Sequence, residues 1–478
     1  MQALPRNDSQ ARKNLWANIH RLPNEILGYI FTLGCPALSV EEHRGTIDPR
    51  PFQVLVSSIC RLWRDVAHGT PALWTMMFIR LPIAEGRPSE LCEILLQDAF
   101  DRSGLMDLAL YVVQREGFHM RRRGFSTSPR ILSIIKEIFP RLNQLYLNAD
   151  VHTTDIESIF PITDLRRSRN IFLNTRNTRL SQQDFIREFT LIDGSHVFEK
   201  AETFEIYLHR YSLPEKTAFT SLASLRKLTC HSDSINEDLT NTVTKMPRLE
   251  HLSLTGPYVT SGIKSISSSS LIRLELHLFD HSIGSSTILE ALDSLPKLTH
   301  FTLITGGNRV GRWTRLYEHS PRTHDENRLF IPCLMTLLIG PYGDLPYCPL
   351  TSVGPVIQHA PNLAAFELWD SDAMDAIRAL LGSDERLLSC SYPNLRLIRV
   401  VFSPRLLTPD YMDEMTASCR TILERRPNLR MEWYFRSPLG RGQGIPRYIE
   451  QPPDGALFCG AKSDNIPSLE TALEGLPL

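Results

Sequence analysis

Leu225-Arg226-Lys227-Leu228-Thr229-Cys230 begins the stretch that decides the fold, and Leu249-Glu250-His251-Leu252-Ser253-Leu254 repeats its pattern further along the chain. The shared pattern is a Leu-x-x-Leu-x-Leu spacing, often preceded by a short helix-ending peptide with a proline. Further copies begin at Leu142, Leu271, Leu298, Leu334, Leu363 and Leu395, and a degenerate copy lies at Leu429. From Leu225 onward the copies are spaced by roughly 22 to 36 residues, a period that predicts strand-and-helix units stacked into a solenoid.

A unit of this size cannot cover its own apolar side, so its leucines must be buried by the neighbouring units. We therefore predict an α/β protein with an irregular leucine-rich-repeat array over residues 151–435 and a parallel sheet on its open face. The array is irregular because the Asn or Cys usual after the last consensus leucine is replaced by Asp150, Asp233, Pro257 and Phe279. An α/β domain with unrelated strands is the alternative. No repeat can be placed in residues 151–221.

The amino-terminal part of the chain has helical periodicity instead. Pro23 suits the first position of a helix, and Ile26, Leu27, Ile30 and Phe31 then recur on one side of it. After a polar insert at about residues 35–50, a second helix is predicted from about Phe52 to Ala67, ended by Gly69 and Pro71. Two neighbouring stripes of this second helix are apolar. A module this short cannot bury both, so we expect the uncovered stripe to bind a partner.

Three segments of residues 19–78 resemble the F-box: Leu22-Pro23-Asn24-Glu25-Ile26-Leu27, Arg61-Leu62-Trp63-Arg64 and Pro71-Ala72-Leu73-Trp74. The resemblance is to the expanded F-box families of fungi, although the insert is longer than the compact family pattern. It implies that a Skp-type adaptor, and through it a cullin, are partners. The adaptor contacts that it implies are Leu22, Pro23, Ile26, Leu27, Val56, Cys60 and Trp63. The alternative is that these residues pack against the following domain.

The remaining segments complete the predicted organisation. Residues 1–18 form an amino-terminal tail, and residues 79–150 hold a helix–strand linker region and the first repeat. Within that region, we predict a helix from about Ser89 to Ser103 and a strand from Leu105 to Val112. Residues 436–478 are rich in proline and glycine and are interpreted as a poorly packed tail.

Residues between the consensus leucines must point away from the core. One resulting row reads Lys227, His251, Arg273 and His300 on four successive strands. An acidic or phosphorylated peptide laid across this row could accept charge-assisted hydrogen bonds, more weakly as the pH rises past the histidine range. Trp369 on the same face is a candidate anchor. The alternative is that charged residues simply fill a solvated face and a loop covers the tryptophan.

Composition excludes several classes of function. The net charge of −1 disfavours a whole-chain electrostatic grip on nucleic acid. No apolar run has the length needed to span a membrane, and the amino terminus lacks the apolar core of a signal peptide. The nine cysteines are scattered singly, which fits a reducing cytoplasmic or nuclear compartment and disfavours a zinc site. No cofactor or metal motif is present.

We therefore expect a non-catalytic substrate-recognition subunit of a Skp–cullin–F-box E3 ubiquitin ligase. In this hypothesis the F-box binds the adaptor and the repeats bind a protein substrate whose identity the sequence does not reveal. A leucine-rich-repeat interaction scaffold without a ligase role is the first alternative. An enzyme with its own active site is the second.

Overall fold

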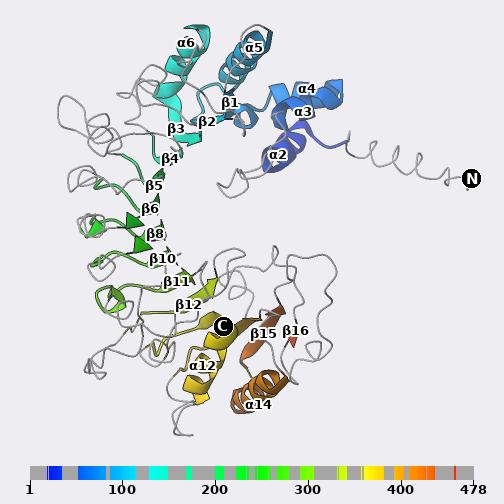
Figure 1. Ribbon diagram of the computed structural model, residues 1–478. Helices are drawn as coiled ribbons and strands as arrows, with labels where there is room; N and C mark the ends of the chain where they lie inside the picture. The colour runs from blue at the N-terminus through cyan, green and yellow to red at the C-terminus, as the bar shows by residue number, and fades with distance from the viewer. Residues whose placement is uncertain are drawn as a thin grey trace, which may run out of the picture. The chain divides into compact units, whose positions relative to one another are not determined.

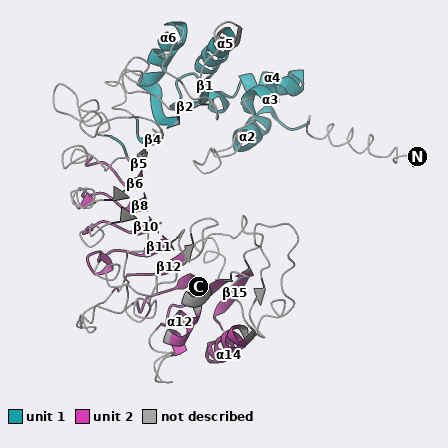
Figure 2. Ribbon diagram, viewed as in Figure 1, with its two compact units in different colours: residues 1–179, 191–201 teal, residues 180–190, 202–478 magenta. Residues whose placement is uncertain are grey.

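The computed structural model describes the following residues: 19, 21–34, 52–81, 87–114, 129–148, 168–174, 200–208, 222–232, 234–235, 243–244, 246–256, 258–259, 266–278, 291–305, 331, 333–341, 357, 360–381, 392–402, 409–426, 428–435 and 457–458. The chain forms two compact units, which are drawn in teal and magenta in Figure 2. Unit 1 is residues 1–179 and 191–201, and unit 2 is residues 180–190 and 202–478. The predicted tail 1–18, the insert 35–50 and the carboxy-terminal tail except 457–458 lie outside the described residues.

A helical cluster opens unit 1. It consists of α2 (Asn24–Gly34), α3 (Phe52–Ile59), α4 (Arg61–His68) and the 3-10 helix η2 (Pro71–Trp74). The prediction of one helix from Phe52 to Ala67 is wrong, because Cys60 adopts an extended conformation (φ −157°, ψ 172°) between α3 and α4. Its Sγ accepts a hydrogen bond from the backbone N–H of Trp63 at 3.4 Å and so caps α4. The break turns the chain, and the ring of Trp63 packs on Phe31 of α2 with 4.9 Å between centroids.

The sheet of unit 1 contains four parallel strands in chain order. They are β1 (Met76–Leu81), β2 (Leu108–Gln114), β3 (Leu142–Asn148) and β4 (Asn170–Asn174). Helices α5 (Arg87–Arg102) and α6 (Pro129–Ile138) pack against each other, and the short η3 (Phe139–Arg141) leads into β3 (Figure 1). The predicted helix at Ser89 corresponds to α5. The predicted strand at Leu105 begins three residues later, because Gly104 makes a turn with positive φ (58°).

Unit 2 is a longer sheet of the same kind. Its parallel strands, in order across the sheet, are β5 (Thr203–Leu208), β6 (Lys227–Ser232), β8 (His251–Gly256), β10 (Arg273–Leu278), β11 (His300–Thr305), β12 (Thr336–Pro341), β13 (Ala365–Trp369), β14 (Leu397–Phe402), β15 (Arg430–Phe435) and β16 (Leu457–Phe458). Strands β7 (Ser234–Ile235) and β9 (Tyr258–Val259) form a separate parallel pair. Helix α12 (Asp370–Leu381) packs on β13, β14 and α14 (Pro409–Arg425). Figure 1 shows the two helices near the carboxy-terminal strands.

The consensus leucines form the core of unit 2, which confirms the predicted repeats. Residues at the three consensus positions are almost completely buried, as in Leu225, Leu228 and Cys230 of the β6 repeat. From β6 to β14, successive repeats are joined at the start of each strand by a regular backbone ladder. Two consecutive N–H groups donate to one carbonyl of the preceding repeat; those of Glu250 and His251, for example, donate to Arg226 at 2.8 and 2.9 Å.

Strands β4 and β5 lie within residues 151–221, where no repeat could be placed from the sequence, because a small residue replaces the first consensus leucine. Ser168 precedes β4 and Ala201 precedes β5 at that position, and both are fully buried. The hydroxyl of Ser168 donates to the carbonyl of Leu142 at 3.2 Å, so its burial leaves no unpaired donor. Trp74 takes the same position before β1, and it is likewise buried.

Candidate functional site

The residues predicted to contact an adaptor fall into two groups in the helical cluster. Pro23 and Ile26 are exposed, and Leu22, Cys60 and Trp63 are partly buried. Leu27 and Val56, by contrast, are only 1% and 3% exposed. These two side chains belong to the buried core of the chain, and their contact with an adaptor stays a prediction.

Two exposed apolar stripes remain on the cluster. Helix α2 carries the α2 stripe, formed at helical spacing by Ile26, Tyr29, Ile30 and Leu33. Helix α3 carries the α3 stripe, formed by Leu55 and Ile59. The exposed fractions of these six residues lie between 43% and 66%. Single exposed apolar residues are ordinary on protein surfaces, whereas repeated ones on one helix face indicate an interaction site.

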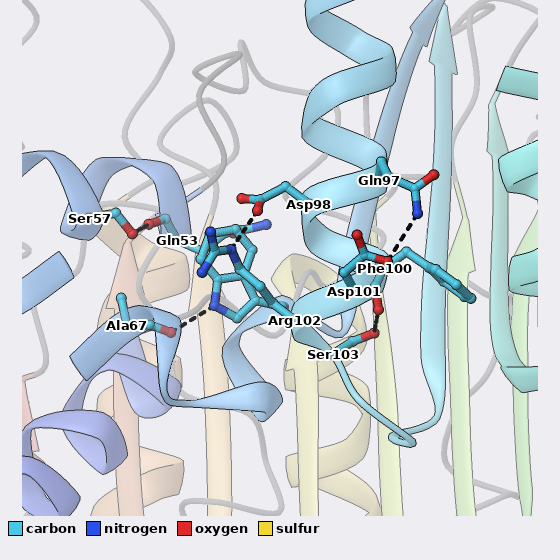
Figure 3. A network of polar contacts seen from close by, with 10 residues as sticks. Gln53, Ser57, Ala67, Gln97, Asp98, Phe100, Asp101, Arg102 and Ser103 are labelled. Atoms are coloured by element: carbon cyan, nitrogen blue, oxygen red, sulfur yellow. Dashed lines mark hydrogen bonds and ion pairs between the residues drawn. The ribbon is translucent and has the colours of Figure 1, made fainter. Parts of the chain in front are cut away.

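A polar and aromatic junction ties this cluster to the first repeat of unit 1 (Figure 3). The indole N–H of Trp74 donates to the carbonyl of Ala67 at 2.7 Å, at the end of α4. The guanidinium of Arg102 from α5 lies 5.1 Å from the Trp74 ring and donates to Asp98 at 2.7 Å. The amide of Gln53 in α3 donates to the carbonyl of Met76 at 3.2 Å. The helical cluster is therefore packed onto the sheet rather than joined by a loose linker.

An aromatic row crosses the sheet of unit 1 on the face opposite the leucine core. Phe78, Tyr111, Tyr146 and Phe172 are paired in register on β1 to β4. Their ring centroids are 5.0, 5.5 and 4.0 Å apart in turn. Sequence reasoning missed this row, although the signal was present: an aromatic residue stands between the last two consensus positions, as in Leu145-Tyr146-Leu147.

The predicted charged row of unit 2 is formed as expected. Lys227, His251, Arg273 and His300 are register partners on β6, β8, β10 and β11. Lys227 is exposed and the other three are partly buried. The Nε of Arg273 lies 3.5 Å from a carboxylate oxygen of Glu275, its neighbour in the adjacent row. We call these four residues the cationic row.

The histidines of this face are held toward their neutral form. Burial, followed by the charges of Arg273 and Lys227, lowers the pKa of His251. Burial and then Arg273 and His251 lower the pKa of His300. Burial also lowers the pKa of His277, although Glu275 acts in the opposite direction. Near neutral pH the permanent positive charges of the row are therefore Lys227 and Arg273.

Toward the carboxy-terminal strands this face is not open, which corrects the prediction. Ala365, Leu397 and Thr336 continue the cationic row on later strands, and all three are buried. In the next row Arg399 is 0% exposed and lies between Glu367 and Glu432, with one 3.0 Å contact to each. Strand β13 includes Trp369, but the side chain of this predicted anchor lies outside the described residues.

Comparisons with known proteins do not assign this chain to a family. No protein-family model matches the chain. No curated protein matches it either. A solved structure described as the crystal structure of the TLR13–ssRNA13 complex is similar over 84% of this chain and 56% of that chain, at 11% identity and a TM-score of 0.37. This chain thus spans about half the length of that structure.

The leucine-rich-repeat character rests on the register and the buried consensus positions described above. Within the described ranges, no helix has both the length and the apolar character needed to cross a membrane. The same part of the chain contains no group of three or more side chains suited to hold a metal ion.

Proposed function

We propose that this chain is the substrate-recognition subunit of a Skp–cullin–F-box ubiquitin ligase. In this proposal the helical cluster of unit 1 binds a Skp-type adaptor, and the repeats bind a protein substrate. The observation that carries it is the pair of exposed apolar stripes on α2 and α3, which occur within the segment that resembles the F-box.

The stripes favour a protein partner on energetic grounds. Full burial of one Leu, Ile or Phe side chain is worth roughly 1.5–3 kcal/mol relative to exposure. The α2 stripe holds three such Leu and Ile side chains together with Tyr29, each about half exposed, so their further burial is a source of binding free energy that the isolated chain does not use. An adaptor helix or groove that covers the α2 stripe would gain it.

The proposed contribution of the chain to ubiquitination is proximity. A substrate held on the repeats reacts at a high effective concentration, so no residue here needs to make or break a bond. The junction at Trp74 supports this role, because it fixes the helical cluster to the first strands of unit 1.

Co-purification with a Skp-type adaptor and a cullin tests the proposal. Ile30→Asp combined with Leu33→Asp places two charges on the α2 stripe and should reduce adaptor recovery at least tenfold. Ile94→Asp is the matched control, since Ile94 is 61% exposed on α5 and belongs to neither stripe. Recovery of adaptor with wild type and control but not with the double variant supports the proposal. Absence of the adaptor from every preparation refutes it.

A leucine-rich-repeat interaction scaffold without a ligase role is the second candidate. The burial of Leu27 and Val56 favours it, because both belong to the set of contacts that the F-box resemblance implies. In that case the α2 stripe would bind a different protein. Pull-downs with wild type would then lack adaptor and cullin but still yield a partner that the Ile30→Asp and Leu33→Asp variant loses.

A further inference from the structure

The cationic row places four basic or protonatable side chains in register on four adjacent strands of unit 2. Adjacent strands of a sheet are about 4.8 Å apart, so the row from Lys227 to His300 extends over about 14 Å. Lys227 and Arg273 are separated by one strand and therefore by about 9.6 Å. The row is accessible, because Lys227 is exposed and the side chain of Arg273 is 27% exposed.

We propose that the cationic row binds an acidic segment of a partner protein. The segment is a stretch of about five residues in the polyproline II conformation that crosses β6 to β11, at a rise of about 3.1 Å per residue. Aspartate or glutamate side chains three residues apart lie on the same side of such a chain, about 9.3 Å apart, and so reach Lys227 and Arg273, while His251 and His300 donate hydrogen bonds beside them. If the proposed ligase role is correct, this segment belongs to the substrate.

Charge complementarity selects this occupant. The charges of Arg273 and Lys227 lower the pKa of His251, and those of Arg273 and His251 lower the pKa of His300. Each histidine thus lies in a positive local field that a carboxylate would relieve. Glu275 and Glu250 raise the pKa of His251, but their effects are smaller than those of Arg273 and Lys227. A bound acidic segment should therefore favour protonation of both histidines and bind more tightly as the pH falls.

The neighbouring rows argue against nucleic acid at the same place. On β6 to β11 these rows hold Thr229, Ser253, Glu275, Thr302, His231, Thr255, His277 and Ile304. They include no Phe, Tyr or Trp on which a base could stack.

Glu275 also provides a test that distinguishes an effect on ligand binding from an effect on folding. Its carboxylate lies 3.5 Å from Arg273 and competes for the same guanidinium that the ligand needs. Removal of that charge should strengthen binding of an acidic segment, whereas removal of Arg273 should weaken it. Opposite effects from two adjacent residues cannot both come from loss of folding.

The experiment uses the purified full chain without adaptor. A random seven-residue peptide library is selected on the immobilised chain, and enriched peptides are measured by fluorescence anisotropy. We expect enrichment of aspartate and glutamate, and loss of binding when these residues are replaced by asparagine and glutamine. Arg273→Gln and Lys227→Gln should each weaken binding about three- to tenfold, and Glu275→Gln should strengthen it. Arg378→Gln on α12, where Arg378 pairs with Glu414, is the matched control and should change nothing.

Two results would overturn the inference. One is a set of selected peptides without excess acidic residues. The other is an Arg273→Gln effect no larger than that of Arg378→Gln. The Ile30→Asp and Leu33→Asp variant separates this inference from the proposed function, since it should lose the adaptor and keep its affinity for the peptide. Peptide binding without adaptor binding to wild type would refute the ligase role alone.

Discussion

The Nε of Arg399 donates to Oε2 of Glu432 at 3.0 Å, and neither side chain has significant contact with solvent. Its Nη1 makes a second 3.0 Å hydrogen bond to Glu367, so the guanidinium lies between carboxylates of the two neighbouring strands. The phenol of Tyr434 donates to Glu432 at 3.3 Å. One arginine thus pairs with carboxylates on both neighbouring strands, a geometry that makes its loss costly.

Arg399→Met should lower the free energy of unfolding of unit 2 by about 3–5 kcal/mol, because it removes the cation that pairs with the buried carboxylates of Glu367 and Glu432, of which Glu432 keeps its contact with Arg430. Hydrogen exchange in peptides from β13 to β15, followed in increasing urea, measures the effect. Arg378→Met is the control, because its ion pair with Glu414 is about half exposed and should contribute about 1 kcal/mol or less. Equal losses from the two variants would contradict the buried arrangement.

The helical cluster should respond differently to changes inside it and on the α2 stripe. Leu27→Ala removes a buried side chain and should cost about 2–5 kcal/mol of unfolding free energy. Leu33→Ala removes a side chain that is 66% exposed and should change stability by about 0.5 kcal/mol or less. Urea denaturation of the two variants in parallel checks this, and a large loss from Leu33→Ala would mean that the stripe is covered within the chain itself.

Cys60 offers a stabilising substitution. A thiol is a weak acceptor, whereas aspartate at the same position would accept the Trp63 N–H more strongly and favour the positive end of the α4 dipole. Cys60→Asp should therefore raise the unfolding free energy of the cluster by about 0.5–1 kcal/mol. Cys60→Ala, which abolishes the cap, should lower it. If both variants matched wild type in thermal and urea unfolding, the Cys60 cap would contribute nothing to the free energy of unfolding.

Unit 2 should lose stability on acidification because of His277. Its pKa in the folded chain is below the ordinary value of 6.5, chiefly through burial, with Glu275 and His231 as the facing groups. The unfolded chain therefore takes up a proton first as the pH falls. The contribution of neutral His277 to the free energy of unfolding is complete above pH 6.5, and it is lost as the pH falls through the pKa of His277 in the folded chain.

Urea unfolding of wild type and His277→Gln at several pH values between about 7.5 and 5.5 measures this contribution. The decline toward acid should be shallower in the variant, which has no titrating group at this position. Parallel pH profiles for the two chains would show that other groups account for the whole decline.

The sheet was predictable because the consensus leucines fix both the repeat and the register. Once Leu228, Leu252 and Leu274 share one face, the residues between them must align, and Lys227, His251 and Arg273 do so. Strands β4 and β5 were not predictable in this way, since Ser168 and Ala201 replace the leading leucine. A small buried residue at that position has no apolar signature of its own.

The helical cluster was predictable in outline but not in detail. An apolar pattern continues through Cys60, so nothing in the periodicity indicates that the helix breaks there. Leu27 and Ile26 are equally apolar, and which of them points inward depends on where α3 and α4 lie. Likewise, the alternation at Glu367 and Arg399 indicates an outward-facing row but cannot show that the row is buried.

Trp74 belongs to two structures at once, since it ends η2 and also takes the leading position of the first strand repeat. Truncation after residue 78 would therefore cut through β1 and strip the indole of the neighbours that enclose it. A fragment intended to carry only the proposed adaptor-binding surface should extend at least through α5 and β2, to Gln114. The end of the F-box-like segment at residue 78 and the end of the smallest fragment that we expect to fold on its own, Gln114, are therefore different positions in the chain.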